Sequence, residues 1–165
     1  ADKVEQLVVC RSCSKNFGMY RDRIGACSLI AKNSTVADII YATIQRVVRV
    51  NYSMPPAHGA AVVETILGSE ELTSQWHGEL EVMRDRISQM RQAFVDSLAA
   101  RGVEQDFSFI ARQNGMFSFL GINGEQVQRL QDEFSIYIVG SSRINVAGIS
   151  PDNIDYLSDS IAKVL

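Results

Sequence analysis

The spacing of apolar residues changes several times along the chain, and each change marks the start of another predicted strand or helix. An apolar run at residues 7–10 predicts a buried strand, and the small and apolar residues 24–30 predict a second strand. A polar, glycine-containing stretch between them predicts a turn. From Ser34 or Thr35, either of which can cap a helix, apolar residues recur at helical spacing. We expect this helix to bury one face, made of Val36, Ile39, Ile40, Ile44, Val47 and Val48.

Two further helices are predicted in the middle of the chain. Prolines within residues 51–56 end the first helix, and residues 57–67 form a short helix that stops at Gly68. Ser69 caps the longest element, which continues toward Gly102 and would span about 45 Å at 1.5 Å per residue. Gly78 is expected to bend or interrupt it. Its apolar stripe reads as core and consists of Leu72, Trp76, Leu80, Met83, Ile87, Met90, Phe94 and Leu98.

The last third of the chain mixes short strands and helices. Strands are predicted at residues 116–120, 136–139 and 143–146, the later two as antiparallel neighbours of the first, and a helix at 125–134. Pro151 is expected at the first position of a final helix. We therefore predict an α/β fold class in two parts. Residues 1–68 resemble the end of a large α/β domain, and residues 69–165 form a long linking helix and a small α+β domain.

Composition narrows the class of protein. The 165 residues are 46% hydrophobic and 21% charged, which is typical of a globular chain, and the net charge is −3. We therefore expect no nucleic acid and no acidic membrane as partner. No apolar run approaches the ~20 residues that span a bilayer, and no signal segment opens the chain. A cytoplasmic location is the resulting expectation.

The three cysteines are Cys10, Cys13 and Cys27, and an odd number cannot pair completely, which favours a reducing compartment. Cys10 and Cys13 formally make a C-x-x-C motif. Lys15 and a Phe-Gly pair follow it, whereas a thioredoxin-like site would place the motif at the start of a helix. A zinc site would need four suitably spaced ligands. The favoured interpretation is small buried thiols at a strand end, with no metal site.

Lys15 stands in the turn that follows the first strand, and hydroxyls and an arginine lie close to it in sequence. A partly desolvated lysine there would offer a nucleophilic amine that forms imines with carbonyls. Ser12, Ser14 and Arg23 suit a phosphate beside that amine. An amine next to a phosphate site matches the needs of pyridoxal 5'-phosphate, which carries an aldehyde and an anion. The alternative is an ordinary exposed lysine at a strand end.

Four sequence blocks in order resemble one family. They are SKNFGMY with RIG at residues 14–25, RVNYS with PPAHG at 49–59, QNGMFSF at 113–119 and SRINVAG at 142–148. Together they resemble class I pyridoxal-phosphate-dependent aminotransferases, in particular the aspartate and aromatic amino acid branch. The resemblance implies the C-terminal portion of that fold: the end of the large-domain sheet, the linking helix and the small domain.

The resemblance also implies roles for single residues. Lys15 would be the catalytic lysine that binds the cofactor as an imine, with Ser12, Ser14 and Arg23 on its phosphate. Arg143 would bind the substrate's α-carboxylate, and Ser142 stands before it where relatives have glycine. Arg49 would reach a partner subunit's site in a homodimer and bind a side-chain carboxylate. The implied substrates are aspartate, glutamate or aromatic amino acids and their 2-oxo acids.

Other parts of the family's cofactor site have no match here. These are a carboxylate for the pyridine nitrogen, a ring stacked on its face and a glycine-rich phosphate turn, all of which precede the lysine in the family. We therefore expect this chain on its own to be inactive as an aminotransferase. A non-catalytic domain that keeps the fold for binding or assembly is the alternative function.

Overall fold

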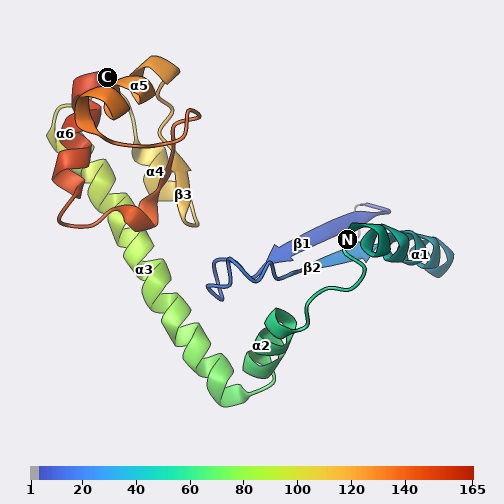
Figure 1. Ribbon diagram of the computed structural model, residues 1–165. Helices are drawn as coiled ribbons and strands as arrows, with labels where there is room; N and C mark the ends of the chain where they lie inside the picture. Colours follow the sequence, from blue (N-terminus) through green and yellow to red (C-terminus); the bar gives the residue numbers. More distant parts are fainter. Residues whose placement is uncertain (1–3) are drawn as a thin grey trace. The chain divides into compact units, whose positions relative to one another are not determined.

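The computed structural model describes residues 4–165, which form two compact units (Figure 1). The first unit ends at His77 and the second runs from Gly78 to Leu165. Their boundary falls inside the longest helix, α3 (Glu70–Ala100), which is unbroken at Gly78, so the predicted interruption is wrong. Ser69 caps α3 as predicted, because its hydroxyl accepts a hydrogen bond from the Leu72 N–H at 3.3 Å. The division at residue 68 stays a prediction.

The first unit contains an antiparallel pair of strands, β1 (Leu7–Ser12) and β2 (Gly25–Ile30). Their register pairs Leu7 with Ile30 and Ser12 with Gly25. The strands exist as predicted, but the expectation of burial is wrong, because Leu7 is 37% and Val8 59% exposed. Within residues 4–165 these two strands pair only with each other, so an apolar run that would suit a sheet interior faces outward.

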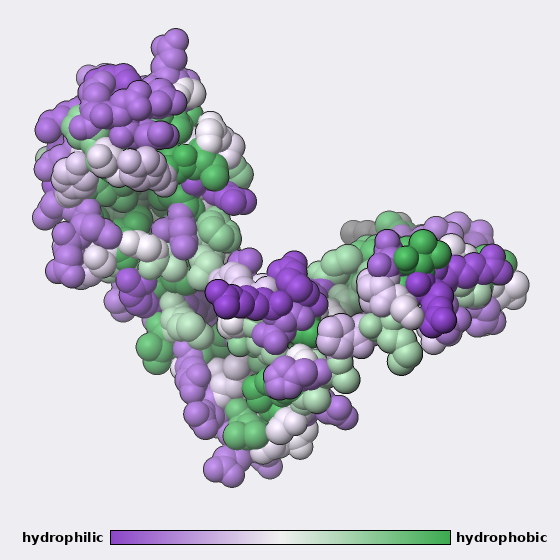
Figure 2. All heavy atoms as spheres, viewed as in Figure 1, coloured by the Kyte–Doolittle hydropathy of each residue, from purple (hydrophilic) through white to green (hydrophobic). Residues whose placement is uncertain are grey.

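This unit also contains two whole helices, α1 (Ser34–Asn51) and α2 (His58–Leu67), and the start of α3. The side chain of Asn33 caps α1 by accepting from the Val36 N–H at 3.0 Å, in place of the predicted Ser34 or Thr35. No residue of α1 is buried, and Ile39 and Val47 of the predicted buried face are 62% and 53% exposed. Figure 2 shows hydrophobic residues, coloured green, on the surface of the first unit.

The second unit has a compact core around the end of α3. Its other elements are α4 (Ser108–Arg112), β3 (Phe117–Phe119), α5 (Gly124–Phe134), β4 (Arg143–Asn145), the 3-10 turn η1 (Val146–Gly148) and α6 (Ile154–Val164). Only the later part of the predicted α3 stripe enters the core. The buried hydrophobic residues are Phe94, Leu98, Phe107, Ile110, Leu120, Ile122, Val127, Leu130, Ile144, Val146, Ile149, Ile161 and Val164.

Two predictions for the second unit need correction, and one helix was missed. β3 and β4 are antiparallel neighbours as expected, but residues 136–139 form no strand. Their Ile136 and Ile138 pack against the core without a strand partner. Pro151 lies in a turn before α6, whose N-cap is Asn153. Helix α4 was not predicted, because five residues are too few to display helical periodicity. No helix in residues 4–165 has the length and apolar character of a membrane span.

Candidate functional site

The segment between β1 and β2 is held in a compact turn by its own backbone. The Cys13 N–H donates to the Ile24 carbonyl at 2.9 Å, and the Phe17 N–H donates to the Cys13 carbonyl at 3.3 Å. Gly25 faces Ser12 across the strand pair, and a Cβ at Gly25 would collide with the Arg11 carbonyl oxygen. The close approach of β2 to the end of β1 therefore requires glycine at this position.

Two hydroxyls meet at the end of β1. The hydroxyls of Ser12 and Ser14 share a hydrogen bond at 2.9 Å, and the Ser14 N–H also donates to Ser12 Oγ at 3.1 Å. Ser14 is buried, with 6% of its surface exposed. One O–H···O bond uses one of the two hydroxyl protons, so the other can be donated to an anion. This donor pair fits a phosphate group.

Lys15 follows this pair directly. Its side chain is exposed, so the expectation of partial desolvation is wrong for this chain. The Lys15 Nζ lies 4.9 Å from the centroid of the Tyr20 ring. A cation over an aromatic face is attracted by the ring quadrupole. The contact holds the amine over the turn that also carries Ser12 and Ser14.

Arg23 has a left-handed backbone conformation, with φ of 55°, which is uncommon for a residue other than glycine. Its Nη1 donates to the Tyr20 carbonyl at 3.0 Å. This bond ties the guanidinium to the turn that contains Lys15. Ser12, Ser14, Lys15 and Arg23 therefore all belong to the β1–β2 connection and its strand ends, and their hydroxyl, ammonium and guanidinium donors suit a phosphate.

The turn is also anchored to the first helical turns of α3. The Trp76 indole Nε1 donates to the Asn16 carbonyl at 2.8 Å, and its ring stacks on Phe17 with centroids 4.5 Å apart. The spacing of apolar residues predicts Trp76 only as part of the apolar stripe of α3. Trp76 and Asn16 are 60 positions apart in the sequence, so no local sequence pattern predicts this contact.

Arg143 lies in the second unit, at the start of β4. Its Cζ is 4.9 Å from the centroid of the Phe117 ring. Among the described residues, no acidic side chain forms an ion pair with Arg143. The preceding Ser142 has φ of 61° and is buried, and its hydroxyl accepts from the Gly121 N–H at 3.2 Å. An exposed, oriented guanidinium of this kind can bind a carboxylate with two parallel hydrogen bonds.

A buried arginine supports the neighbouring strand β3. Arg91 of α3 is 2% exposed and donates to the carbonyls of Ile110, Gly115 and Phe117 at 3.0, 2.7 and 3.0 Å and to the Ser118 hydroxyl. Burial lowers the pKa of the Arg91 guanidinium from its ordinary value. Because Arg91 holds the Phe117 backbone, it also supports the ring beside Arg143.

Arg49 lies in the last turn of α1 and is exposed. Its Nη1 donates to the Ser53 hydroxyl at 2.9 Å, and Ser53 has φ of 64°. A cation in the last turn also stabilises the helix through its dipole. Within the first unit, Arg49 belongs to the far end of α1 and not to the β1–β2 turn.

Comparison with known proteins gives the same family throughout. The family model described as "Aminotransferase class I and II" matches residues 1–161. The chain is 51% identical over 161 residues to an aspartate aminotransferase of Escherichia coli (strain K12), with 98% of this chain and 41% of that protein covered. It is 43% identical over 164 residues to an aromatic-amino-acid aminotransferase of Pseudomonas aeruginosa, with 99% and 41% covered.

A solved structure agrees with these matches. It is an aromatic-amino-acid aminotransferase from Burkholderia pseudomallei covalently bound to pyridoxal phosphate, with a TM-score of 0.87 and 46% identity. The match covers 96% of this chain and 40% of that one. The chain thus spans about two-fifths of the length of the relatives that it matches.

Proposed function

Because this chain belongs to the class I and II aminotransferase family, we propose that it supplies the catalytic lysine and two carboxylate-binding arginines of an aminotransferase. The complete protein would transfer an amino group between an L-amino acid and a 2-oxo acid with pyridoxal 5'-phosphate. The relatives named above are aspartate and aromatic-amino-acid aminotransferases, so a non-catalytic domain is not favoured.

One observation carries the proposal: an amine, two hydroxyls and a guanidinium belong to the β1–β2 turn and the adjoining end of β1. Lys15 Nζ lies over Tyr20, Ser12 and Ser14 share a hydrogen bond, and Arg23 bonds back to the same turn. A ligand that carries both an aldehyde and a phosphate satisfies this set, because the amine binds the aldehyde while the other donors hold the anion.

Each residue then has a defined task. When bound, pyridoxal phosphate supplies an aldehyde and a ring that accepts electrons. Ser12, Ser14 and Arg23 hold the phosphate and so fix the cofactor's orientation. The Lys15 amine would hold the cofactor at its aldehyde carbon, and as a free amine it would move a proton between the substrate's α-carbon and that former aldehyde carbon. Trp76 holds the Asn16 backbone next to Lys15 and limits its movement.

We assign substrate recognition to the two arginines. Arg143 binds the α-carboxylate, and the Phe117 ring orients its guanidinium. Arg49 binds the side-chain carboxylate of aspartate or glutamate in a neighbouring subunit, which makes the complete protein a homodimer. We further propose a cytoplasmic location, a reducing compartment that suits the free thiols of this chain.

Reductive trapping tests the role of Lys15. The 165-residue chain is incubated with pyridoxal phosphate, reduced with borohydride and digested with trypsin. Modification of Lys15 blocks cleavage there, so the label should appear on residues 12–21. Lys32 serves as an internal comparison, because it is an exposed lysine engaged with Glu5 at 2.8 Å. Equal labelling of Lys15 and Lys32, or unchanged total labelling in Lys15→Arg, would contradict the assignment.

Activity is measured on the complete protein. Amino-group transfer from aspartate or phenylalanine to 2-oxoglutarate should disappear in Lys15→Ala. Arg49→Ala should weaken aspartate far more than phenylalanine, because only aspartate carries a side-chain carboxylate. An equal loss for both substrates would assign Arg49 a structural role.

A further inference from the structure

Two cysteines of the first unit face each other across the β1–β2 pair. Cys10 on β1 is the register partner of Cys27 on β2, and their sulfurs are 3.8 Å apart, within a weak S–H···S hydrogen bond. Both thiols are free and exposed. The hydrogen bond with Cys10, followed by burial and charge, raises the pKa of the Cys27 thiol. The expectation of buried thiols at a strand end is therefore wrong for both residues.

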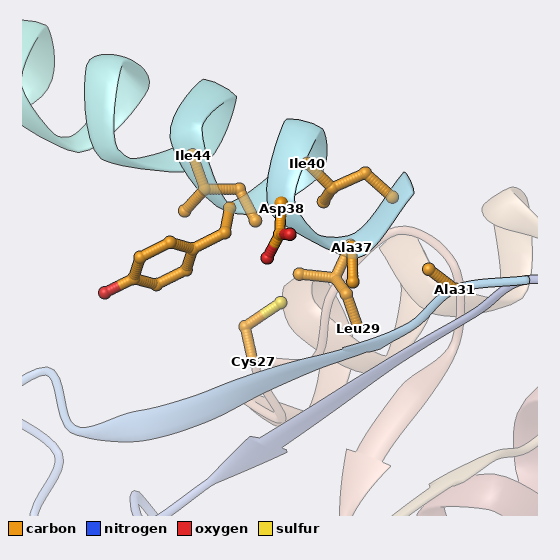
Figure 3. Close-up of a pocket in the computed structure, with 8 residues that line it drawn as sticks. Cys27, Leu29, Ala31, Ala37, Asp38, Ile40 and Ile44 are labelled. Carbon is orange, nitrogen blue, oxygen red and sulfur yellow. The ribbon is translucent and has the colours of Figure 1, made fainter. Parts of the chain in front are cut away.

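Cys27 lines a groove between β2 and α1. Figure 3 shows the Cys27 side chain directed into this groove, beside Leu29 of β2 and beneath Ala37 and Asp38 of α1. The groove has a volume of about 360 Å³. Side chains of directly opposed residues lie on the same face of a strand pair, so Cys10 is on this face too. A small reagent in solvent can therefore reach both sulfurs.

The backbone geometry already suits a disulfide bond. Directly opposed residues in an antiparallel pair have Cα atoms about 4.5–5.5 Å apart. Disulfides need a Cα separation of about 4.4–6.8 Å and a sulfur–sulfur bond of about 2.05 Å. The two sulfurs can close the remaining distance by side-chain rotation, with the strand pairing kept.

We propose that Cys10 and Cys27 form a reversible intramolecular disulfide when this 165-residue chain meets a hydroperoxide. One thiolate attacks the peroxide oxygen, giving a sulfenic acid and releasing an alcohol, or water when the oxidant is hydrogen peroxide. The second thiolate attacks the sulfenic sulfur, forms the S–S bond and expels hydroxide, which becomes water. Two electrons pass from the two thiols to the peroxide, and a dithiol reductant returns them.

The bond would enclose the whole candidate cofactor segment. Cys10 and Cys27 are 17 positions apart, and Ser12, Ser14, Lys15 and Arg23 all lie between them. Closing this ring restricts the unfolded and partly opened forms of the segment. The pair differs from the C-x-x-C motif noted in the sequence, because strand register and not sequence spacing selects Cys27 as the partner of Cys10. This inference does not depend on the proposed aminotransferase function.

Trypsin makes the test direct, because it places the three cysteines on different peptides. Cys10 falls on residues 4–11, Cys13 on 12–15 and Cys27 on 24–32. The chain is treated with hydrogen peroxide, and the remaining thiols are then alkylated before digestion without reductant. We expect peptides 4–11 and 24–32 to be joined, with a mass lower by two hydrogens, and Cys13 to be alkylated. Treatment with dithiothreitol should restore three alkylatable thiols.

Matched single substitutions separate the possibilities. Cys13→Ser should form the linked peptides to the same extent as the parent, and Cys10→Ser should lose them while keeping the parent's circular dichroism spectrum. The linked fraction should not change on tenfold dilution of the protein. Linkage of peptides 4–11 and 12–15, linkage that falls on dilution, or oxidation of all three thiols without any linkage would overturn the proposal.

Discussion

The Trp76 indole donates a hydrogen bond to the Asn16 carbonyl at 2.8 Å, which joins the start of α3 to the residue next to Lys15. The same indole stacks on Phe17, the next residue along. Two separate interactions with one side chain therefore hold the turn at this end. A hydrogen bond contributes about 1 kcal/mol and an aromatic pair about another 0.5–1.5 kcal/mol.

Substituting Trp76 should therefore open the turn in two steps. Trp76→Phe keeps a ring but removes the donor, and Trp76→Ala removes both. Tryptic cleavage after Lys15 should rise by about fivefold in the first variant and about thirtyfold in the second, as these energies imply. Cleavage after Arg84, an exposed residue of the second unit, provides the internal control. Equal rates at Lys15 in all three proteins would show that Trp76 does not restrain the turn.

The contact between Arg143 and Phe117 predicts a graded loss of substrate affinity in the complete protein. Arg143→Ala should weaken binding of the amino acid by about 2–5 kcal/mol and leave cofactor binding unchanged. Phe117→Leu should cost about 0.5–1 kcal/mol, because the cation–π contact is lost and the charge stays. Phe119→Leu is the control, since Phe119 is the register partner of Arg143 but the ring beside the guanidinium is Phe117. Titration of amino acid and of cofactor separates these effects.

Arg91 should stabilise the second unit strongly, because its buried guanidinium donates several hydrogen bonds to the backbone and to Ser118. Arg91→Met leaves three carbonyls and the Ser118 hydroxyl without their donor, so we expect a loss of at least about 3 kcal/mol in the free energy of unfolding. Arg84→Met removes an exposed arginine from the same helix and should cost less than about 1 kcal/mol. Urea unfolding measures both, and similar small losses would contradict a structural role for Arg91.

Ser142 offers a test of backbone strain beside Arg143. Its φ of 61° favours glycine, while its hydroxyl bonds to the Gly121 N–H. Ser142→Ala loses the bond and keeps the strain, whereas Ser142→Gly loses the bond and relieves the strain. The glycine variant should therefore be more stable than the alanine variant by about 0.5–1 kcal/mol. The reverse order in thermal unfolding would refute the strain argument.

Acid should destabilise the second unit through two carboxylates. The backbone N–H and the hydroxyl of Ser108 lower the pKa of Asp106, and the hydrogen bond from Arg129 lowers the pKa of Glu133. A carboxyl whose pKa is lower in the folded state stabilises the fold above its unfolded pKa, and this stabilisation disappears as the pH falls through the folded pKa. The thermal midpoint should therefore fall between about pH 6 and about pH 3.

The double variant Asp106→Asn, Glu133→Gln provides the check on this pH dependence. Both side chains are then neutral at every pH, so the thermal midpoint should fall less on acidification than in the parent. An equally steep fall in both proteins would place the acid sensitivity in other groups.

Local sequence was sufficient wherever the determining contacts are local. The strand–turn–strand order around Lys15, the cap at Ser69 and the helical part of residues 125–134 all depend on residues within a few positions of each other. Ser12, Ser14 and Lys15 lie within four positions of one another, so the sequence alone places them together where β1 ends and the turn begins. Their roles toward a cofactor remain predictions that the proposed experiments test.

Tertiary structure alone decided burial and long-range pairing. The apolar face of α1 was expected inside because its spacing is helical, but burial depends on what covers a face, and nothing in the local pattern encodes that. Residues 136–139 have strand-like composition yet form no strand: Ile136 and Ile138 pack on the core, but the backbone of the segment has no ladder partner among the described strands. The contacts of Trp76 with Asn16 and of Cys10 with Cys27 depend on helix placement and strand register, and a single sequence specifies neither.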